Sequence, residues 1–197
     1  MEDDRHGAKQ PRRFDPAKAS MLDDRARFES LPPAGVLAML DIPRNGWIVD
    51  FGTGTGTYAL EIAAARPDVT VVALDEQRAM LDRLSAKLAA RPLPNVKVVL
   101  ARTPAARALE GRADRVLALN VLHELGDDAL RELAALLASA GRALFIDWNA
   151  DVDRTAGPPR EHVYSPDDAA HRLASFGFAV AERRLFRDQY GLLCAKA

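Results

Sequence analysis

Residues 48–57 read IVDFGTGTGT, and this stretch decides the fold that the sequence predicts. An apolar run ends in a carboxylate, glycines follow at alternating positions, and the next residues, YALEIAAA, have the composition of a helix. A strand, a glycine turn and a helix in this order let the backbone approach a nucleotide-like ligand. Glycine suits such a turn because it accepts positive φ and has no Cβ to hold a ligand away. The dinucleotide pattern G-x-G-x-x-G needs a glycine where this chain has Thr57, so an NAD-dependent enzyme is disfavoured.

A second carboxylate, Asp75, follows the next apolar run, VTVVAL at residues 69–74. Its distance from the glycines suits one strand–helix–strand unit, in which an acidic residue lies about 20 residues past the turn. A carboxylate at a strand tip can accept both hydroxyls of a ribose, so Asp75 is the expected diol ligand. A tight turn without any ligand is the simpler alternative, and the carboxylates on both sides of the turn argue against it.

Length and composition predict one soluble domain. The chain has 197 residues, of which 48% are hydrophobic and 28% charged. A net charge of −1 leaves no basic excess to neutralise a phosphate backbone, which argues weakly against nucleic acid as a partner. No apolar run reaches membrane-spanning length and the N-terminus lacks a signal-peptide pattern, so no membrane partner and a cytoplasmic location are expected. Residues 1–13 are charged and aperiodic, which predicts a flexible tail before a single domain over 14–197, with cap helices over 14–45.

Strand and helix patterns alternate along this domain. Helical spacing or start signals are found at residues 32–40, 76–90, 127–139 and 165–177, and Gly141 is expected to end the third of these helices. Strand patterns follow the first two strands at residues 96–101, 115–119, 143–147, 178–186 and 190–196. The last two are joined by a tight connection, which predicts a hairpin. The whole pattern predicts an α/β fold: a Rossmann-like sheet, mostly parallel, with a C-terminal antiparallel hairpin and helices on both faces.

The pattern D-x-G-x-G-x-G at residues 50–56 resembles motif I of the class I S-adenosylmethionine (SAM)-dependent methyltransferases. Residues 114–125, DRVLALNVLHEL, resemble the fourth-strand motif of the "type 11" group, which includes ubiquinone- and menaquinone-biosynthesis enzymes. Two further parts resemble a small bacterial branch of that group: FDPAKA, LDD and LPP between residues 14 and 33, and Asp147-Trp148 followed by GPP at 157–159 and His162. The resemblance covers roughly residues 14–197. It implies the seven-stranded methyltransferase sheet and SAM as the cofactor, but it does not specify the substrate.

The chain departs from this group at two points. Many relatives carry Gly-Asp-Ala after the third strand, with the Asp bonded to the adenine amine, whereas this chain has Ala101-Arg102-Thr103. An arginine cannot accept that bond, so adenine recognition would rest on the backbone or on the Thr103 hydroxyl. Relatives also often have a Pro-Gly-Gly turn before the fifth strand, where residues 139–141 read SAG.

The resemblance and the converging strand ends together predict the cofactor contacts. The carboxyl ends of parallel strands meet at one edge of the sheet, and ligands bind there. The predicted cofactor-binding residues are Asp50, Gly52, Thr53, Gly54, Gly56, Tyr58, Asp75, Glu76, Met80, Arg102, Thr103 and Asn120.

Two residues are candidates for catalysis. His123 lies just past the fourth strand, where a general base could reach the substrate, or it is a packed histidine bonded to the backbone. Asp147 could orient the substrate, act as a base or cap the loop that follows it. His162 and Tyr164 lie in a loop that could cover the pocket or could be ordinary surface.

Other side chains have simpler interpretations. Asp147 and Asn149 faintly resemble the metal ligands of catechol-type O-methyltransferases, but Asn120 stands where a further acid is needed, so no metal is predicted. Cys194 is expected to pack in the last strand and His171 to face solvent on a helix.

The predicted function is SAM-dependent methyl transfer to a small-molecule acceptor of unknown identity. The alternative is a catalytically silent SAM-binding sensor or partner subunit. Residues 14–31 are predicted to be helical with Met21, Arg25 and Phe28 on one face, either as a lid that closes over the cofactor or as fixed scaffold. The oligomeric state is not predicted.

Overall fold

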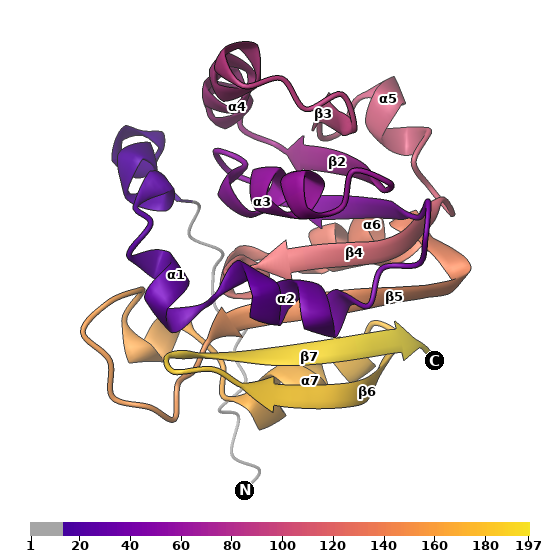
Figure 1. The fold of residues 1–197 in the computed structure, drawn as a ribbon. Coiled ribbons are helices and arrows are strands. Elements are labelled where there is room, and N and C mark those ends of the chain that lie inside the picture. Colours follow the sequence, from indigo (N-terminus) through magenta and orange to yellow (C-terminus); the bar gives the residue numbers. More distant parts are fainter. Residues whose placement is uncertain (1–13) are drawn as a thin grey trace, which may run out of the picture.

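A seven-stranded sheet organises the part of the chain that the structure, a computed structural model, describes, namely residues 14–197. The predicted tail at residues 1–13 lies outside the described residues. The strands are β1 (Trp47–Phe51), β2 (Thr70–Asp75), β3 (Val96–Leu100), β4 (Ala113–Leu119), β5 (Leu137–Trp148), β6 (Phe178–Leu185) and β7 (Gln189–Lys196). Their order in the sheet is β3-β2-β1-β4-β5-β7-β6, and only the pairs made by β7 are antiparallel. The predicted sheet and its C-terminal hairpin are confirmed (Figure 1).

Helices cover both faces of the sheet, with α2 and α3 on the near face and α6 and α7 on the far face in Figure 1. The α-helices are α1 (Arg27–Ser30), α2 (Pro33–Leu40), α3 (Thr57–Ala65), α4 (Arg78–Ala90), α5 (Pro104–Arg107), α6 (Asp127–Leu136) and α7 (Pro166–Ala174). Three short 3₁₀ helices are η1 (Pro16–Asp23), η2 (Leu122–Glu124) and η3 (Arg160–His162). None of the described helices is both long and apolar enough to cross a membrane.

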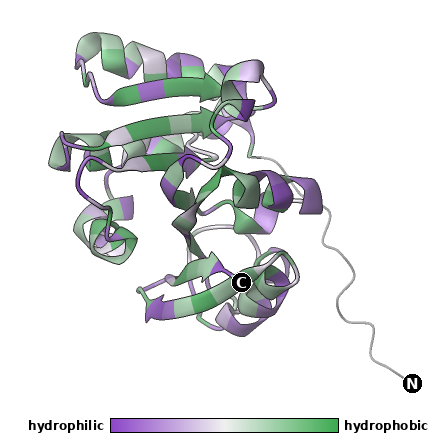
Figure 2. Ribbon diagram, turned by 90° about the vertical axis from the view of Figure 1, so that its right-hand side faces the viewer, coloured by the Kyte–Doolittle hydropathy of each residue, from purple (hydrophilic) through white to green (hydrophobic). Residues whose placement is uncertain are grey.

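The central strands are apolar on both faces because each face of the sheet has its own core. In β1, Ile48 packs into the core shared with α2, α3 and α4, whereas the next residue, Val49, packs into the core shared with α6 and α7. In β2, Val71 and Val72 divide between the two cores in the same way. Successive side chains of a strand point to opposite faces, so a buried parallel strand has no polar side. Hydrophobic residues accordingly run along the strands between the helices (Figure 2).

The order of the strands also places the site. β1 pairs with β2 on one side and with β4 on the other, so the chain changes direction across the sheet between these neighbours. All three strands are parallel, and their carboxyl ends open at the same edge. In open α/β sheets, ligands bind in the crevice at this switch in strand order.

The predicted helix over residues 127–139, with Gly141 as its end, is wrong at its C-terminus. Helix α6 ends at Leu136, and β5 begins at once with Leu137, which pairs with Ala113. The register then shifts between the start of β4 and β5, and a Cβ on Gly141 would lie 2.6 Å from the Ala113 carbonyl oxygen. Gly141 therefore serves a strand irregularity rather than a helix terminus.

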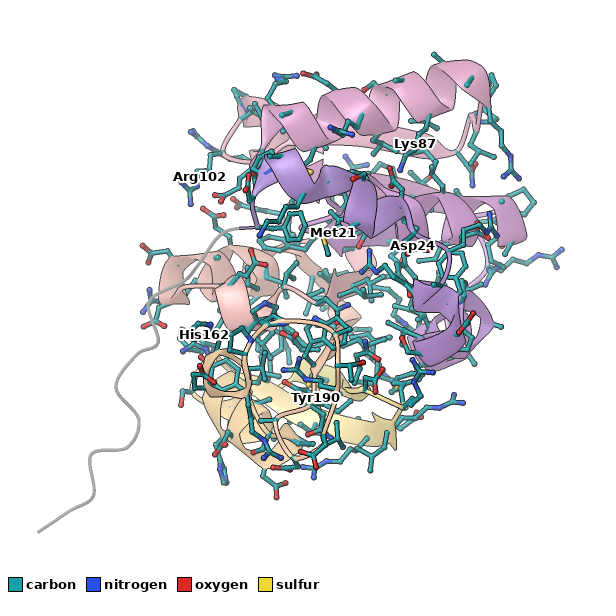
Figure 3. All side chains as sticks on the ribbon, turned by 90° about the vertical axis from the view of Figure 1, so that its left-hand side faces the viewer. Met21, Asp24, Lys87, Arg102, His162 and Tyr190 are labelled. Atoms are coloured by element: carbon teal, nitrogen blue, oxygen red, sulfur yellow. The ribbon has the colours of Figure 1, made fainter. Side chains whose placement is uncertain are left out.

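The prediction that Met21, Arg25 and Phe28 share one helical face is also wrong. Residues 14–31, here called the strap, consist of η1, a break at the extended residue Asp24, and the short helix α1. The break separates Met21, which is 62% exposed, from Phe28, so the predicted shared face does not form. Met21 and Asp24 both lie on the strap in Figure 3. By contrast, the predicted start of α7 is confirmed, because the Ser165 hydroxyl accepts the Asp168 N–H.

Candidate active site

A cavity of about 1030 Å³ opens at the carboxyl ends of β1, β2 and β4. This volume lies at the upper end of the range for small-molecule sites, roughly 300–1,000 Å³. Its wall is formed by the strap, the glycine turn, the ends of β2, β3 and β4, and the start of α6. The lining residues used below are Phe14, Leu22, Arg27, Asp50, Gly52, Thr53, Gly54, Tyr58, Asp75, Glu76, Gln77, Met80, Arg102, Asn120, Glu124, Asp127, Asp128, Arg131 and Arg172.

The glycine turn is folded by its own backbone. Gly52, Gly54 and Gly56 have φ values of 72°, 56° and 78°, all in the left-handed region that favours glycine. The N–H groups of Gly52 and Thr53 both donate to the Leu74 carbonyl, at 2.8 and 3.0 Å, which ties the turn to the end of β2. A Cβ on Gly54 would come within 3.0 Å of the Leu22 side chain, so the strap lies against this glycine.

Asp50 and Asp75 are the two carboxylates at this end of the cavity. The Thr53 hydroxyl donates to Asp50 at 2.6 Å, and Asp75 accepts the N–H groups of Gly54 and Gln77, both at 2.8 Å. Each carboxylate keeps free lone pairs for a ligand. Burial raises the pKa of Asp50 to about 6, against the Thr53 bond that lowers it and with a contribution from the charge of Asp75. Burial also raises the pKa of Asp75, although the backbone bonds of Gln77 and Gly54 oppose it. A ligand with a positive charge or hydroxyl donors would stabilise the ionised forms of both.

All but two of the predicted cofactor contacts line the cavity. The exceptions are Gly56, which packs against Leu84 at the start of α3, and Thr103. The Thr103 hydroxyl donates to the Leu100 carbonyl at 2.7 Å and accepts the Ala106 N–H at 3.3 Å, so it caps α5 instead of facing the cavity. The Thr103 hydroxyl is therefore already bonded within the protein.

Arg102 stands at the mouth of the cavity, where many relatives have an aspartate. Its side chain is 61% exposed and its guanidinium lies 3.5 Å from the Glu76 carboxylate. Its φ of 61° is unusual for a residue with a Cβ. Figure 3 shows the Arg102 side chain at the edge of the molecule.

Asn120 directly follows β4 and lines the cavity. Its φ of 56° lies in the left-handed region, which asparagine tolerates better than most residues. Its side-chain oxygen Oδ1 is buried and has no hydrogen-bond partner among the described residues. Buried acceptors are almost always bonded, so this atom is placed for a donor carried by a ligand.

His123 and Asp147 contact each other, and neither lines the cavity. Asp147 is fully buried and accepts three donors: the His123 N–H at 2.8 Å, the Trp148 N–H at 2.7 Å and the His123 ring nitrogen Nδ1 at 2.8 Å. Burial lowers the pKa of His123, but the charge and hydrogen bond of Asp147 and the charge of Glu124 outweigh it, so the net pKa is raised. The structure thus joins the two predicted catalytic residues behind the cavity wall.

Three residues that shape this cavity were not predicted from the sequence. Glu124 lines it and accepts the Phe14 N–H at 2.9 Å. Asp23 accepts the Thr55 hydroxyl and the Lys87 ammonium, both at 2.5 Å, which fixes the strap to the glycine turn. Glu124 directly follows His123 in the strand-four motif, and that position was the only local signal. Nothing local marks Asp23 or Lys87, because their partners are remote in sequence.

The other candidates lie outside the cavity lining. His162 lies in η3, and the carbonyl of Tyr164 accepts the Ala150 N–H at 3.2 Å. Cys194 is buried in β7, where burial raises the pKa of its thiol to about 12 and so suppresses the reactive thiolate. His171 is exposed on α7. Among residues 14–197, no group of three or more His, Cys, Asp and Glu side chains is placed to hold a metal ion.

Comparison with known proteins agrees with this geometry. Residues 48–141 match a family model described as "Methyltransferase domain". A 16S rRNA (adenine(1408)-N(1))-methyltransferase of Streptoalloteichus tenebrarius is 30% identical over 162 residues, which cover 72% of this chain and 73% of that protein. The chain belongs to the class I SAM-dependent methyltransferases. SAM is therefore the cofactor of this methyltransferase.

Solved structures show the same fold. A SAM-dependent methyltransferase from Aquifex aeolicus is 26% identical, with a TM-score of 0.84 over 94% of this chain and 100% of that chain. A putative type 11 methyltransferase from Sulfolobus solfataricus is 20% identical, with a TM-score of 0.68 over 85% of this chain and 92% of that chain.

The residues present fit SAM on three observations. The turn presents Gly52 and Gly54, which have no side chain, to the cavity, and two buried carboxylates have raised pKa values that a cation or hydroxyl donors would relieve. The orphaned Oδ1 of Asn120 adds an acceptor for an ammonium group. SAM carries all of these features: a sulfonium, an ammonium and a ribose diol.

Proposed function

We propose that this methyltransferase transfers the methyl group of SAM to a small-molecule acceptor. When bound, SAM supplies a methyl group on a sulfonium, which is already a good leaving group. The protein must bind the cofactor, align the acceptor and exclude water. We assign the ribose diol to Asp75 and the methionine end to Asp50, the glycine turn and Asn120.

This assignment leaves the β4 end of the cavity for the acceptor. Asp50 and Asp75 lie at the ends of the neighbouring strands β1 and β2, so the cofactor occupies that side. Past β4, the lining continues through Glu124 to Arg131 at the start of α6. The strap lies over the cavity and contacts both of its ends. The Phe14 N–H donates to Glu124 past β4, and the Phe14 carbonyl accepts the Gln77 side chain past β2 at 3.1 Å.

The pairing of charges in the lining is the main observation in support of an acceptor that is small and uncharged or weakly charged. Three arginines of the lining are each matched by a carboxylate: Arg102 by Glu76 at 3.5 Å, Arg131 by Asp128 at 2.7 Å and Arg172 by Asp127 at 3.2 Å. The remaining arginine of the lining, Arg27, donates to the Leu22 carbonyl at 2.9 Å. A surface that binds nucleic acid needs cations available to phosphates, and the arginines of this lining already have partners within the protein.

An rRNA acceptor is the competing candidate, because the Streptoalloteichus relative is named for methylation of an adenine in 16S rRNA. A catalytically silent SAM-binding sensor is the second alternative, and Arg102 at the usual adenine-binding aspartate favours it. His123 and Asp147 stay candidates for the reaction itself. Their burial behind Glu124 supports a role through that residue rather than direct contact with the acceptor.

Formation of S-adenosylhomocysteine (SAH) separates these functions. The purified protein is given SAM with a panel of phenols, catechols, carboxylic acids, amines and thiols, and in parallel with 30S ribosomal subunits and transfer RNA. We expect SAH with members of the small-molecule panel and none with RNA. Methyl label in the RNA fraction would replace the proposal with the rRNA function. Tight SAH binding without turnover of any acceptor would favour the sensor.

A further inference from the structure

One carboxylate of the cavity wall has no part in the cofactor contacts proposed above. Glu124 ends η2, directly after β4, and its side chain is 18% exposed. One oxygen, Oε2, accepts the Phe14 N–H at 2.9 Å. The other, Oε1, faces the ring of His123.

The neighbouring carboxylates differ from Glu124 in both exposure and pairing. Asp127 and Asp128 are 58% and 93% exposed, and each contacts an arginine. Glu124 is therefore the half-buried carboxylate at the acceptor end of the cavity, and no arginine or lysine pairs with it among the contacts of the described residues.

A fixed imidazole lies behind this carboxylate. Asp147 holds His123 through Nδ1 at 2.8 Å, and this bond turns the other ring nitrogen, Nε2, toward Glu124 Oε1 at 3.6 Å. The distance is that of an ion pair rather than of a tight hydrogen bond. The histidine side chain is 8% exposed and Asp147 1%, so both are locked in place, and Glu124 is the member of the array that reaches the cavity.

We infer that Glu124 accepts the proton of the methyl acceptor, and that His123, held by Asp147, is a positioning residue for this carboxylate. The inference rests on the proposed function and narrows the acceptor to a hydroxyl or amine that loses a proton when it is methylated. The acceptor atom attacks the methyl carbon, the carbon–sulfur bond breaks and its electron pair stays on sulfur, which gives SAH. The proton leaves the acceptor for the Glu124 carboxylate and passes from there to solvent.

The charges around Glu124 suit this role. Burial raises its pKa, the charge of His123 and the bond from Phe14 lower it, and the charges of Asp147 and Asp75 raise it again. The net pKa is above that of an ordinary glutamate, so the carboxylate is a stronger base. His123 stabilises the ionised form that must be present before the acceptor arrives.

Binding of two SAM analogues tests the position of Glu124 without any acceptor. Sinefungin carries an amine where SAM carries the transferable methyl group, and SAH carries nothing there. A carboxylate beside that position favours sinefungin, and loss of one charge-assisted hydrogen bond removes about tenfold in affinity. Calorimetry is done with wild type, Glu124→Gln and a control, Glu182→Gln, on the exposed strand β6.

Wild type and the control should bind sinefungin about tenfold more tightly than SAH. Glu124→Gln should lose this preference while its SAH affinity stays within about twofold. An unchanged preference would overturn the inference, and so would an equal loss for both analogues, which would make Glu124 a cofactor contact. Thermal unfolding checks the fold. If Glu124→Gln is unfolded, Glu124→Asp, which keeps the charge one methylene further back, must show a reduced preference.

The rate–pH profile tests the proton transfer and His123. With any acceptor that wild type turns over, Glu124→Gln should lower kcat by about a hundredfold or more at constant KM for SAM. Because His123 lowers the pKa of Glu124, His123→Gln should move the acid limb of the profile to higher pH. An unmoved limb would remove the positioning role. If wild type turns over no small acceptor, the proposed function fails, while the sinefungin comparison still decides where Glu124 lies.

Discussion

The two ends of the cavity are built in different ways. At the β1–β2 end, the backbone fixes the site. The glycine turn donates to the Leu74 carbonyl, and Asp75 accepts the N–H groups of Gln77, two residues away, and of Gly54 in the turn. At the β4 end, side chains from distant elements fix one another, as in the contacts of His123 with Asp147 and of Glu124 with Phe14. A cofactor common to a large family needs an invariant frame, whereas an acceptor site built from side chains can change with each substrate.

The largest expected effect comes from breaking the backbone-built end. Gly54→Val places a branched side chain at a φ of 56°, against Leu22, in the lining of the cavity. We expect SAH binding to fall below detection in calorimetry at millimolar ligand. Gly111→Val is the matched control, because Gly111 has a φ of 69° but open space around its Cβ position. It should lose stability and keep binding. Unchanged affinity in a folded Gly54→Val protein would show that the turn is not the cofactor cradle.

A pH series measures how much the buried Asp50 carboxylate at the same end destabilises the protein without ligand. Asp50 has a pKa of about 6 when folded and about 4 when unfolded, so the unfolded chain releases its proton first as the pH rises. The contribution of Asp50 to the free energy of unfolding therefore falls between pH 4 and 6. The difference in this free energy between Asp50→Asn and wild type should shift by about 3 kcal/mol in favour of the variant from pH 4 to pH 7. We expect urea unfolding to show this widening gap between Asp50→Asn and wild type. Asp82→Asn, an exposed change on α4, should show none; a constant gap for Asp50→Asn contradicts its raised pKa.

Asp75→Ala tests the ribose contact at the cofactor end of the cavity. The carboxylate is expected to accept the two ribose hydroxyls, and a charged hydrogen bond contributes roughly 1.5–3 kcal/mol. SAH should bind about tenfold to a hundredfold more weakly. Asp75→Asn keeps one acceptor oxygen, so its SAH affinity should lie between those of wild type and Asp75→Ala. Asp82→Ala should bind SAH as wild type does. A loss below about threefold, or roughly 0.6 kcal/mol, places the ribose elsewhere.

The smallest effect is expected where the strap joins the two ends. Asp23→Asn removes the charge that Lys87 and Thr55 contact, and an exposed ion pair contributes at most about 1 kcal/mol, or fivefold in affinity. SAH affinity should fall by that much or less, and amide exchange in residues 14–31 should speed up. Asp24→Asn, which keeps an acceptor for the Ala26 N–H, is the control. If wild-type exchange in the strap is the same with and without SAH, the strap is scaffold and not a lid.

The same contrast explains what the sequence could predict. The β1 strand, the glycine turn and Asp75 lie within one strand–helix–strand unit, so their geometry follows from residues close in the chain. Ser165 likewise starts α7 through a local bond. Gly141 was assigned to the wrong element because its close neighbour is the Ala113 carbonyl of another strand.

Glu124 was not predicted as a site residue for a similar reason. Its partner Phe14 is 110 residues away, and the Asp23–Lys87 contact spans 64 residues. No periodicity or motif carries such pairs, because only the folded sheet brings them together. The prediction for His123 and Asp147 named the right strand ends but not their mutual contact, which removes both from the cavity lining.

A crystal structure of the SAH complex tests the central claim, that one cavity holds the cofactor at its backbone-built end and leaves the β4 end for the acceptor. We expect both ribose hydroxyls within roughly 2.6–3.2 Å of the Asp75 carboxylate. We also expect the open side of the thioether sulfur to face Glu124, with unfilled cavity between them. A ribose bound to another group, or a sulfur that faces away from the β4 end, would contradict the account.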